Sequence, residues 1–167
     1  MSKKTECSAF RAQLVVPEHR QLFDYWMSCC AGRAMPTRQD IKPSQMARLL
    51  PGISLVDVAE DLARSTIRLA GTRLREIHDR EITGQTIESL EWGDKRDYWL
   101  AAYRHTVERC EPTQGVLKGP RLHKEHMVQY WLRLPLSREQ GGKAEMVLGY
   151  DFFVPAADRY TAQLQIA

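Results

Sequence analysis

The sequence lacks the features that would assign it to a membrane or to a standard nucleotide-binding fold. It has no run of about 18 apolar residues, the length that a transmembrane helix requires. The lysines near the N-terminus are not followed by the apolar stretch of a signal peptide. A P-loop and a GxGxxG motif are also absent. We therefore expect a cytoplasmic protein with no membrane partner and no standard phosphate-binding loop.

Cysteine spacing and charge give no sign of a metal or a nucleic acid. The four cysteines, Cys7, Cys29, Cys30 and Cys110, have no CxxC spacing, and the two neighbours cannot easily bridge each other. The 24 basic and 21 acidic residues are mixed along the chain and leave a formal charge of +3. Such a mixture does not form the basic stripe that binds a polyanion. We expect reduced thiols and no nucleic-acid partner.

The sequence does contain enough apolar residues for one folded domain. A chain of 167 residues with 43% hydrophobic residues is the size of a single domain with one core. Residues 1–16 have weak periodicity and precede Pro17, which predicts a flexible N-terminal arm. The folded domain is predicted at 17–155, followed by a C-terminal tail at 156–167.

The domain is predicted to begin with a helix at 17–32 that has a wide apolar face. Apolar residues recur every three or four positions from Leu22 to Cys29, with others beside them, and Gly32 ends the pattern. Because this face is wider than one sheet requires, we expect part of it to contact a second copy of the chain. The alternative is that the helix only closes its own sheet. The predicted interface residues are Leu22, Phe23, Trp26 and Met27.

Alternation of apolar and polar residues predicts five strands, with helical patterns between them. The Gly141-Gly142 pair is a turn signal that joins the last two strands as a hairpin. The short Glu60-Asp61 link does the same for the first two. The predicted strands are 53–59, 65–70, 113–122, 127–136 and 144–154, and the predicted helices between them are 72–78 and 94–110, with a further short helix at 44–50.

This order of elements predicts an α+β fold. Its five-stranded antiparallel sheet carries on one face the helices that lie between the second and third strands. The other face also needs a cover, because Val56, Val58, Trp131 and Val147 lie out of phase with the main apolar set. We expect the helix at 17–32 to cover these four residues, in cis or across a dimer.

Five short motifs, which span roughly residues 22–155, resemble those of the small bacterial PAS-like proteins found mainly in alphaproteobacteria. Asp79 departs from the pattern, because the family usually has glycine there, although aspartate tolerates a left-handed backbone better than most residues. The resemblance implies a PAS fold at 17–155 and a role in signalling, and it brings no catalytic residues. The motifs are Tyr25-Trp26, Pro36-x-Arg38-x-Asp40-x-x-Pro43, Leu50-Pro51-x-Ile53-x-Leu55-x-Asp57-Val58, Arg68-Leu69-x-Gly71-Thr72 and Arg80-Glu81-Ile82-Thr83-Gly84.

The polar and aromatic residues of the predicted domain suggest a ligand pocket. Asp57 and Arg68 lie on paired strands, where they form either a structural ion pair or a contact with a ligand. Several aromatic residues either line an inner cavity or fill the core. The aromatic candidates are Trp92, Tyr98, Trp99, Tyr103 and Tyr130.

The histidines do not support a metal site, a cofactor or a catalytic group. His123 and His126 are three residues apart, and on an extended strand they point to opposite faces. His105 lies only partly within the buried stripe of its helix, which does not favour a haem ligand. His78 lies at the end of a short helix, where a cation is favourable. No cysteine or serine lies next to a histidine in a catalytic motif.

The sequence therefore predicts a non-catalytic sensor or adaptor. It would act through a homodimer or by docking to an unknown signalling protein, with or without a small-molecule ligand in its pocket. A different class of function is a small enzyme with an enclosed cavity on a curved sheet. In that case Asp57 and either His78 or His105 would serve as acid and base.

Overall fold

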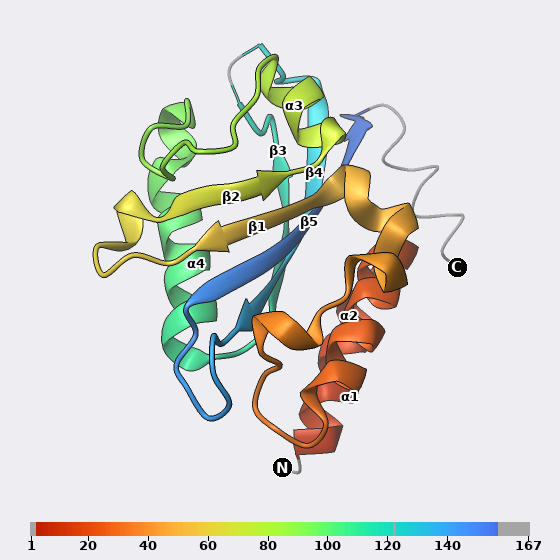
Figure 1. The fold of residues 1–167 in the computed structure, drawn as a ribbon. Helices are drawn as coiled ribbons and strands as arrows, with labels where there is room; N and C mark the ends of the chain where they lie inside the picture. Colours follow the sequence, from red (N-terminus) through yellow and green to blue (C-terminus); the bar gives the residue numbers. More distant parts are fainter. Residues whose placement is uncertain (1–2, 122, 157–167) are drawn as a thin grey trace.

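A computed structural model, which describes residues 3–121 and 123–156, contains one five-stranded antiparallel sheet (Figure 1). The strand order is β2-β1-β5-β4-β3, so the first and last strands of the chain lie side by side at the centre. The predicted fold class and both hairpins are confirmed. The strands are β1 (Ile53–Asp57), β2 (Thr66–Ala70), β3 (Thr113–Lys118), β4 (Met127–Leu136) and β5 (Met146–Pro155).

The helices begin and end where local chemistry favours it. The helix α2 has proline in its first turn and ends at Ala31 and Gly32, which both adopt positive φ angles. Asp79, which follows α3, also adopts a left-handed conformation, with φ of 55°. The α-helices are α1 (Lys3–Gln13), α2 (Pro17–Cys30), α3 (Thr72–His78) and α4 (Arg96–Arg109), and the 3-10 helices are Arg38–Asp40, Pro43–Gly52, Leu62–Arg64 and Gly93–Lys95. Within residues 3–121 and 123–156, no helix has the length and apolar character needed to cross a bilayer.

Helices cover both faces of the sheet, and α2 and α4 lie on opposite sides of it (Figure 1). On one face, α2 packs on the apolar side chains of β4 and β5, and the indole Nε1 of Trp26 donates a hydrogen bond to the carbonyl of Pro135 at 3.0 Å. On the other face, α4 packs on Val56, Trp131 and Val147. Val58, the fourth residue of the predicted set, packs against the same cluster. The prediction that α2 covers these four residues is therefore wrong. Alternation divides a strand into two faces, but it does not say which helix packs on each face.

The N-terminal segment also differs from the prediction, because Lys3–Gln13 is a helix and not a loose arm. The ring of Phe10 lies 5.1 Å from that of Phe23, and the guanidinium of Arg11 makes two contacts of 2.7 Å with the carboxylate of Asp24. The weak periodicity of this segment is compensated by its packing on α2. The predicted tail at 156–167 lies outside the described residues, except for residue 156.

Burial within the chain changes the interpretation of the proposed dimer interface. Leu22, Phe23 and Trp26 are at most 2% exposed, and Met27 is half-buried. The apolar surface that seemed to exceed the needs of one sheet is taken up by that sheet together with α1. These three buried residues do not provide an interface, and the homodimer stays a prediction that requires another surface.

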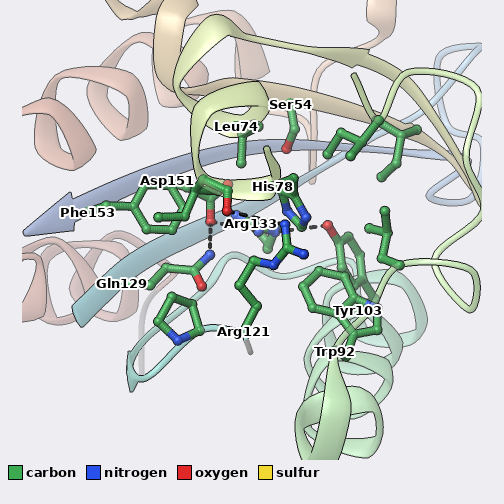
Figure 2. A pocket seen from close by; sticks show the side chains of 15 residues that line it. Ser54, Leu74, His78, Trp92, Tyr103, Arg121, Gln129, Arg133, Asp151 and Phe153 are labelled. Carbon is green, nitrogen blue, oxygen red and sulfur yellow. Dashed lines mark hydrogen bonds and ion pairs between the residues drawn. The ribbon is translucent and has the colours of Figure 1, made fainter. Parts of the chain in front are cut away.

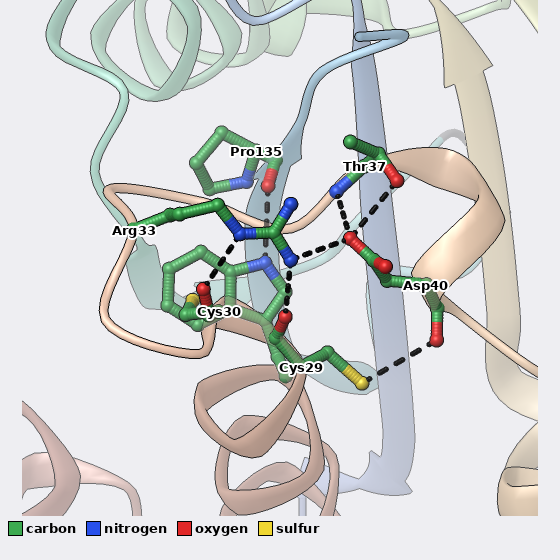
Figure 3. Close-up of polar contacts among 7 residues, drawn as sticks. Cys29, Cys30, Arg33, Thr37, Asp40 and Pro135 are labelled. Carbon is green, nitrogen blue, oxygen red and sulfur yellow. Dashed lines mark hydrogen bonds and ion pairs between the residues drawn. The ribbon is translucent and has the colours of Figure 1, made fainter. Parts of the chain in front are cut away.

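The connector after α2, residues 31–42, is fixed by hydrogen bonds that Thr37 and Asp40 make within it and to the end of α2 (Figure 3). One oxygen of Asp40 accepts from the backbone N–H and hydroxyl of Thr37, at 2.8 and 2.9 Å, and from Arg33 at 2.8 Å. The hydrogen bond from the Thr37 backbone is the main cause that lowers the pKa of Asp40. Arg33 also donates to the carbonyls of Cys29 and Cys30 at the end of α2. This network ties the C-terminal end of α2 to the connector and satisfies carbonyls that the helix leaves unpaired there.

Candidate functional site

The candidate site is a cavity of about 20 Å³ on the α4 face of the sheet (Figure 2). This volume is about the room that one water molecule needs. The strands β1, β4 and β5 form its floor, while α3, α4 and the segments around residues 82–92 and 120–121 cover it. Its polar lining consists of Ser54, His78, Tyr103, Arg121, Gln129, Arg133 and Asp151.

The register of β4 and β5 brings three of these polar residues together. Asp151 lies opposite Trp131, between the diagonal positions of Gln129 and Arg133 on the neighbouring strand. Side chains at such diagonal positions share a face and can reach one another. The ladder therefore places an arginine, a carboxylate and an amide on the floor of one cavity.

Arg133 and Asp151 form a buried ion pair. Nη2 of Arg133 lies 2.9 Å from Oδ1 of Asp151, and the two side chains are 4% and 1% exposed. The amide of Gln129 donates to the same carboxylate oxygen at 2.6 Å. Arg133 also donates from Nε to the hydroxyl of Tyr103 at 3.1 Å, and its guanidinium lies 5.0 Å from the ring centroid of Trp99. The guanidinium is therefore held by hydrogen bonds in its plane and by an aromatic face above it.

The electrostatics of this cluster keep Arg133 charged. Burial alone lowers the pKa of Arg133, but Asp151 and then Tyr103 raise it, and the net shift is upward. Burial raises the pKa of Tyr103, with a smaller opposing effect of Arg133. The cavity therefore presents a charged arginine on its floor and the neutral phenol of Tyr103 on its α4 side.

Two buried polar atoms at the cavity have no hydrogen-bond partner among the described residues. They are Oδ2 of Asp151 and Nε of Arg121. Arg121 uses its other nitrogens, because Nη1 donates to the carbonyl of Ile77 at 3.3 Å and Nη2 contacts Glu91 at 3.2 Å. An acceptor and a donor therefore remain for another molecule.

His78 lines the same cavity and is neutral, not cationic as its helix-end position suggested. Its ring packs edge-on against Trp92 with centroids 5.9 Å apart. Burial, and to a smaller extent the charges of Arg121 and Arg80, lower its pKa to about 4. Burial under the cover outweighs the favourable helix terminus.

The structure places the predicted aromatic candidates in different surroundings. Trp92 and Tyr103 line the cavity. Trp99 is fully buried beside it, and Tyr98 lies partly exposed with its hydroxyl accepting from the indole of Trp131 at 2.8 Å. Tyr130 lies on the opposite sheet face, in a cluster with Val16 and Val128. The predicted lining is therefore wrong for Tyr130, whose position in β4 points to the opposite sheet face, and for Tyr98, which lies on α4 against Trp131 and outside the cavity.

Asp57 and Arg68 are paired with each other away from the cavity. Nη1 of Arg68 lies 3.0 Å from Oδ2 of Asp57, and the Arg68 side chain is largely exposed. The arrangement matches the structural ion pair and not the ligand contact. His105 is also exposed and lies 3.7 Å from Glu111. The acid and base of the alternative enzyme, Asp57 with His78 or His105, are therefore not brought together.

Sequence reasoning missed the main polar residues of the site, which are Arg121, Gln129, Arg133 and Asp151. The sequence did contain a signal for three of them. Gln129, Arg133 and Asp151 are polar, yet they share a strand face with the apolar residues Trp131 and Val147. Within the described ranges 3–121 and 123–156, no group of histidine, cysteine and acidic residues is placed to hold a metal ion.

Comparison with known proteins agrees with this architecture. A family model described as a PAS domain matches residues 14–150. No curated protein matches the chain. A PAS domain from Colwellia psychrerythraea is similar with a TM-score of 0.50 and 13% identity, over 67% of this chain and 96% of that one.

Two light-oxygen-voltage proteins have similar structures. One, from work with a flavin analogue, has a TM-score of 0.51 and 15% identity, over 74% of this chain and 94% of that one. The other is an RNA-binding light-oxygen-voltage receptor with a TM-score of 0.53 and 17% identity, over 78% of this chain and 38% of that one. The chain thus spans well under half of that receptor. At these identities the likeness shows the fold alone.

Proposed function

Because this chain belongs to the PAS domain family of sensory and signalling domains, we propose that it is a non-catalytic sensor or adaptor whose cavity responds to a small polar ligand. The observation that carries the proposal is the buried Arg133–Asp151 pair on the cavity floor. A buried ion pair is often no more stabilising than apolar residues of the same volume, so stability alone does not explain it. Recognition of a polar molecule does explain why charges lie on this wall.

A flavin, named for one of the similar structures, does not fit this cavity. Sites for such ligands occupy about 300–1,000 Å³, whereas the cavity here has about 20 Å³. The Arg133 and Trp92 side chains also occupy the cavity walls where an extended ring system would need space. We therefore favour a small ligand.

The signal would leave through a protein contact, either in a homodimer or with a separate signalling protein in the cytoplasm. The large apolar side chains that are exposed among the described residues are Val15, Leu69, Tyr98 and Val116. They come from different elements and do not select one partner. The narrower assignment to alphaproteobacterial PAS-like proteins is likewise a prediction.

Native mass spectrometry of the full chain tests ligand binding by this cavity. Wild-type protein, incubated with a metabolite extract of the expression host, should carry a bound small molecule. A triple variant with Gln129→Leu, Arg133→Met and Asp151→Leu replaces the polar floor by apolar groups of similar volume and should fold without retaining that molecule. Equal binding by both proteins, or none by either, would contradict the proposal.

A further inference from the structure

The two buried atoms without partners define what a ligand in this cavity must offer. The Asp151 side chain is 1% exposed and that of Arg121 10% exposed, and both line the cavity. Oδ2 of Asp151 can only accept a hydrogen bond, while Nε of Arg121 can only donate one. Buried polar groups in native proteins are nearly always satisfied. A molecule that satisfies both atoms must carry a donor and an acceptor.

The balance of charge around the cavity determines the charge of that molecule. Arg133 is neutralised by Asp151, and Arg121 is neutralised by Glu91 at the rim. The remaining titratable side chains that are buried against the cavity, His78 and Tyr103, are neutral near pH 7, because the pKa of His78 is about 4 and burial raises the pKa of Tyr103. A charged ligand would enter a buried site in which each charge already has a counter-ion, and its own desolvation would not be compensated.

We infer that the cavity binds a small neutral molecule with adjacent donor and acceptor groups, such as a carboxamide or a urea, which donates to Asp151 and accepts from Arg121. This inference rests on the proposed function and specifies its ligand class. The rings of Trp92 and Tyr103 also line the cavity, and aromatic rings pack well against a planar group.

Arg121 has a second role, because it also holds the cover closed. Its guanidinium joins the segment after β3 to the carbonyl of Ile77 at the end of α3 and to the side chain of Glu91. Lys124 adds a contact of 3.3 Å to Asp79 in the same region. A ligand larger than water must displace this cover, so binding and the position of Arg121 are coupled.

Four small probes of similar size and shape separate the possible ligand charges. Acetamide is neutral with a donor and an acceptor, acetone only accepts, acetate is an anion and acetamidinium is a cation. We would titrate each into the isotope-labelled full chain and follow by NMR the side-chain amide of Gln129 and the indole N–H of Trp92. The indole of Trp26, which lies on the opposite sheet face, serves as the internal control.

Acetamide should cause saturable shifts at Gln129 and Trp92 at millimolar concentration, without shifts at Trp26. The other three probes should bind about tenfold more weakly or not at all, because each lacks one hydrogen bond or brings an uncompensated charge. Tighter binding of acetate or acetamidinium would overturn the ligand class while leaving a ligand-binding cavity. Absence of any cavity shift would overturn the inference, and the mass spectrometry above would decide the proposed function separately.

Two variants test the named atoms. Arg121→Met removes the Nε donor and should abolish acetamide binding, whereas Arg80→Met, an exposed arginine near His78, should leave it unchanged. Asp151→Asn leaves Arg133 without its counter-ion, so the preference should shift from acetamide toward acetate. If Asp151→Asn does not fold, the comparison of Arg121→Met with Arg80→Met still tests the assignment. Equal acetamide binding by Arg121→Met and wild type would refute it.

Discussion

Gly149 on β5 lies directly opposite Arg133 on β4, and its missing side chain leaves the space that the guanidinium occupies. A Cβ atom at residue 149 would lie 2.9 Å from Nη1 of Arg133 and 2.5 Å from Oγ of Ser54. Both distances are shorter than van der Waals contact. Glycine in a strand interior usually lowers the stability of the strand. Here the buried ion pair depends on it, because a larger residue would occupy the place of the guanidinium.

Gly149→Ala should destabilise the protein by about 1–3 kcal/mol, because the added methyl group overpacks the cavity floor. Urea unfolding of the variant measures this change. Adding Ser54→Ala removes the closer clash and should recover part of the loss, as a double-mutant cycle would show. An unchanged unfolding free energy for Gly149→Ala would mean that Arg133 has another position available.

The buried pair should show strong non-additivity. Asp151→Leu alone leaves a buried arginine without its counter-ion and should cost about 3–5 kcal/mol. The triple variant with Gln129→Leu, Arg133→Met and Asp151→Leu removes every member of the charged cluster and should lie within about 2 kcal/mol of wild type. Urea unfolding of the two variants gives the comparison. If the triple variant is less stable than Asp151→Leu, the pair stabilises the fold outright.

Sequence patterns were sufficient for the sheet but not for the site. The alternation along Val128–Leu136 and Met146–Val154 defines two long strands, and the Gly141-Gly142 turn requires them to be neighbours, so β4 and β5 follow directly. The contact of Gln129 and Arg133 on β4 with Asp151 on β5 depends on the register, because a shift of one residue between these strands would place Asp151 on the opposite face from the other two.

The covering elements were harder to predict because their positions depend on tertiary packing. Arg121 lies between Ile77 and Glu91 only when the folded chain brings three distant segments together. Helix α1 shows the same limit, since its weak periodicity is compensated by packing of Phe10 on Phe23. Local propensity gives no information about either contact.

Stability should fall with acid because two histidines are buried in the neutral form. Burial lowers the pKa of His19 to about 3 and that of His78 to about 4. Both values lie below the unfolded value of 6.5, so the unfolded state binds more protons between pH 6.5 and these values. The free energy of unfolding therefore rises with pH in this window. Each histidine contributes about 1.4 kcal/mol per pH unit, and this contribution to stability disappears as the pH falls toward the folded-state pKa.

Replacement of one histidine should remove its share of this slope. His19 lies with Nε2 3.2 Å from the carbonyl of Tyr150 and its ring edge-on to the Tyr150 ring. His19→Phe should therefore lower stability at neutral pH but flatten the slope below pH about 6.5 by about half. Urea unfolding at several pH values measures it, with the exposed His105→Phe as the control. An unchanged slope in His19→Phe would show that His19 is not buried in neutral form.

The turn between β4 and β5 gives the last prediction, at Gly141. This residue has φ of 72°, and a Cβ atom built there has no neighbour within 4 Å. A substitution would therefore cost backbone strain and not a clash. Gly141→Val places a β-branched residue in the left-handed region and should cost about 1–2 kcal/mol, whereas Gly141→Asn should cost less, because asparagine tolerates that region. Urea unfolding of both variants measures the difference. Equal losses would indicate that the turn requires glycine for space, contrary to the open surroundings of its α-carbon.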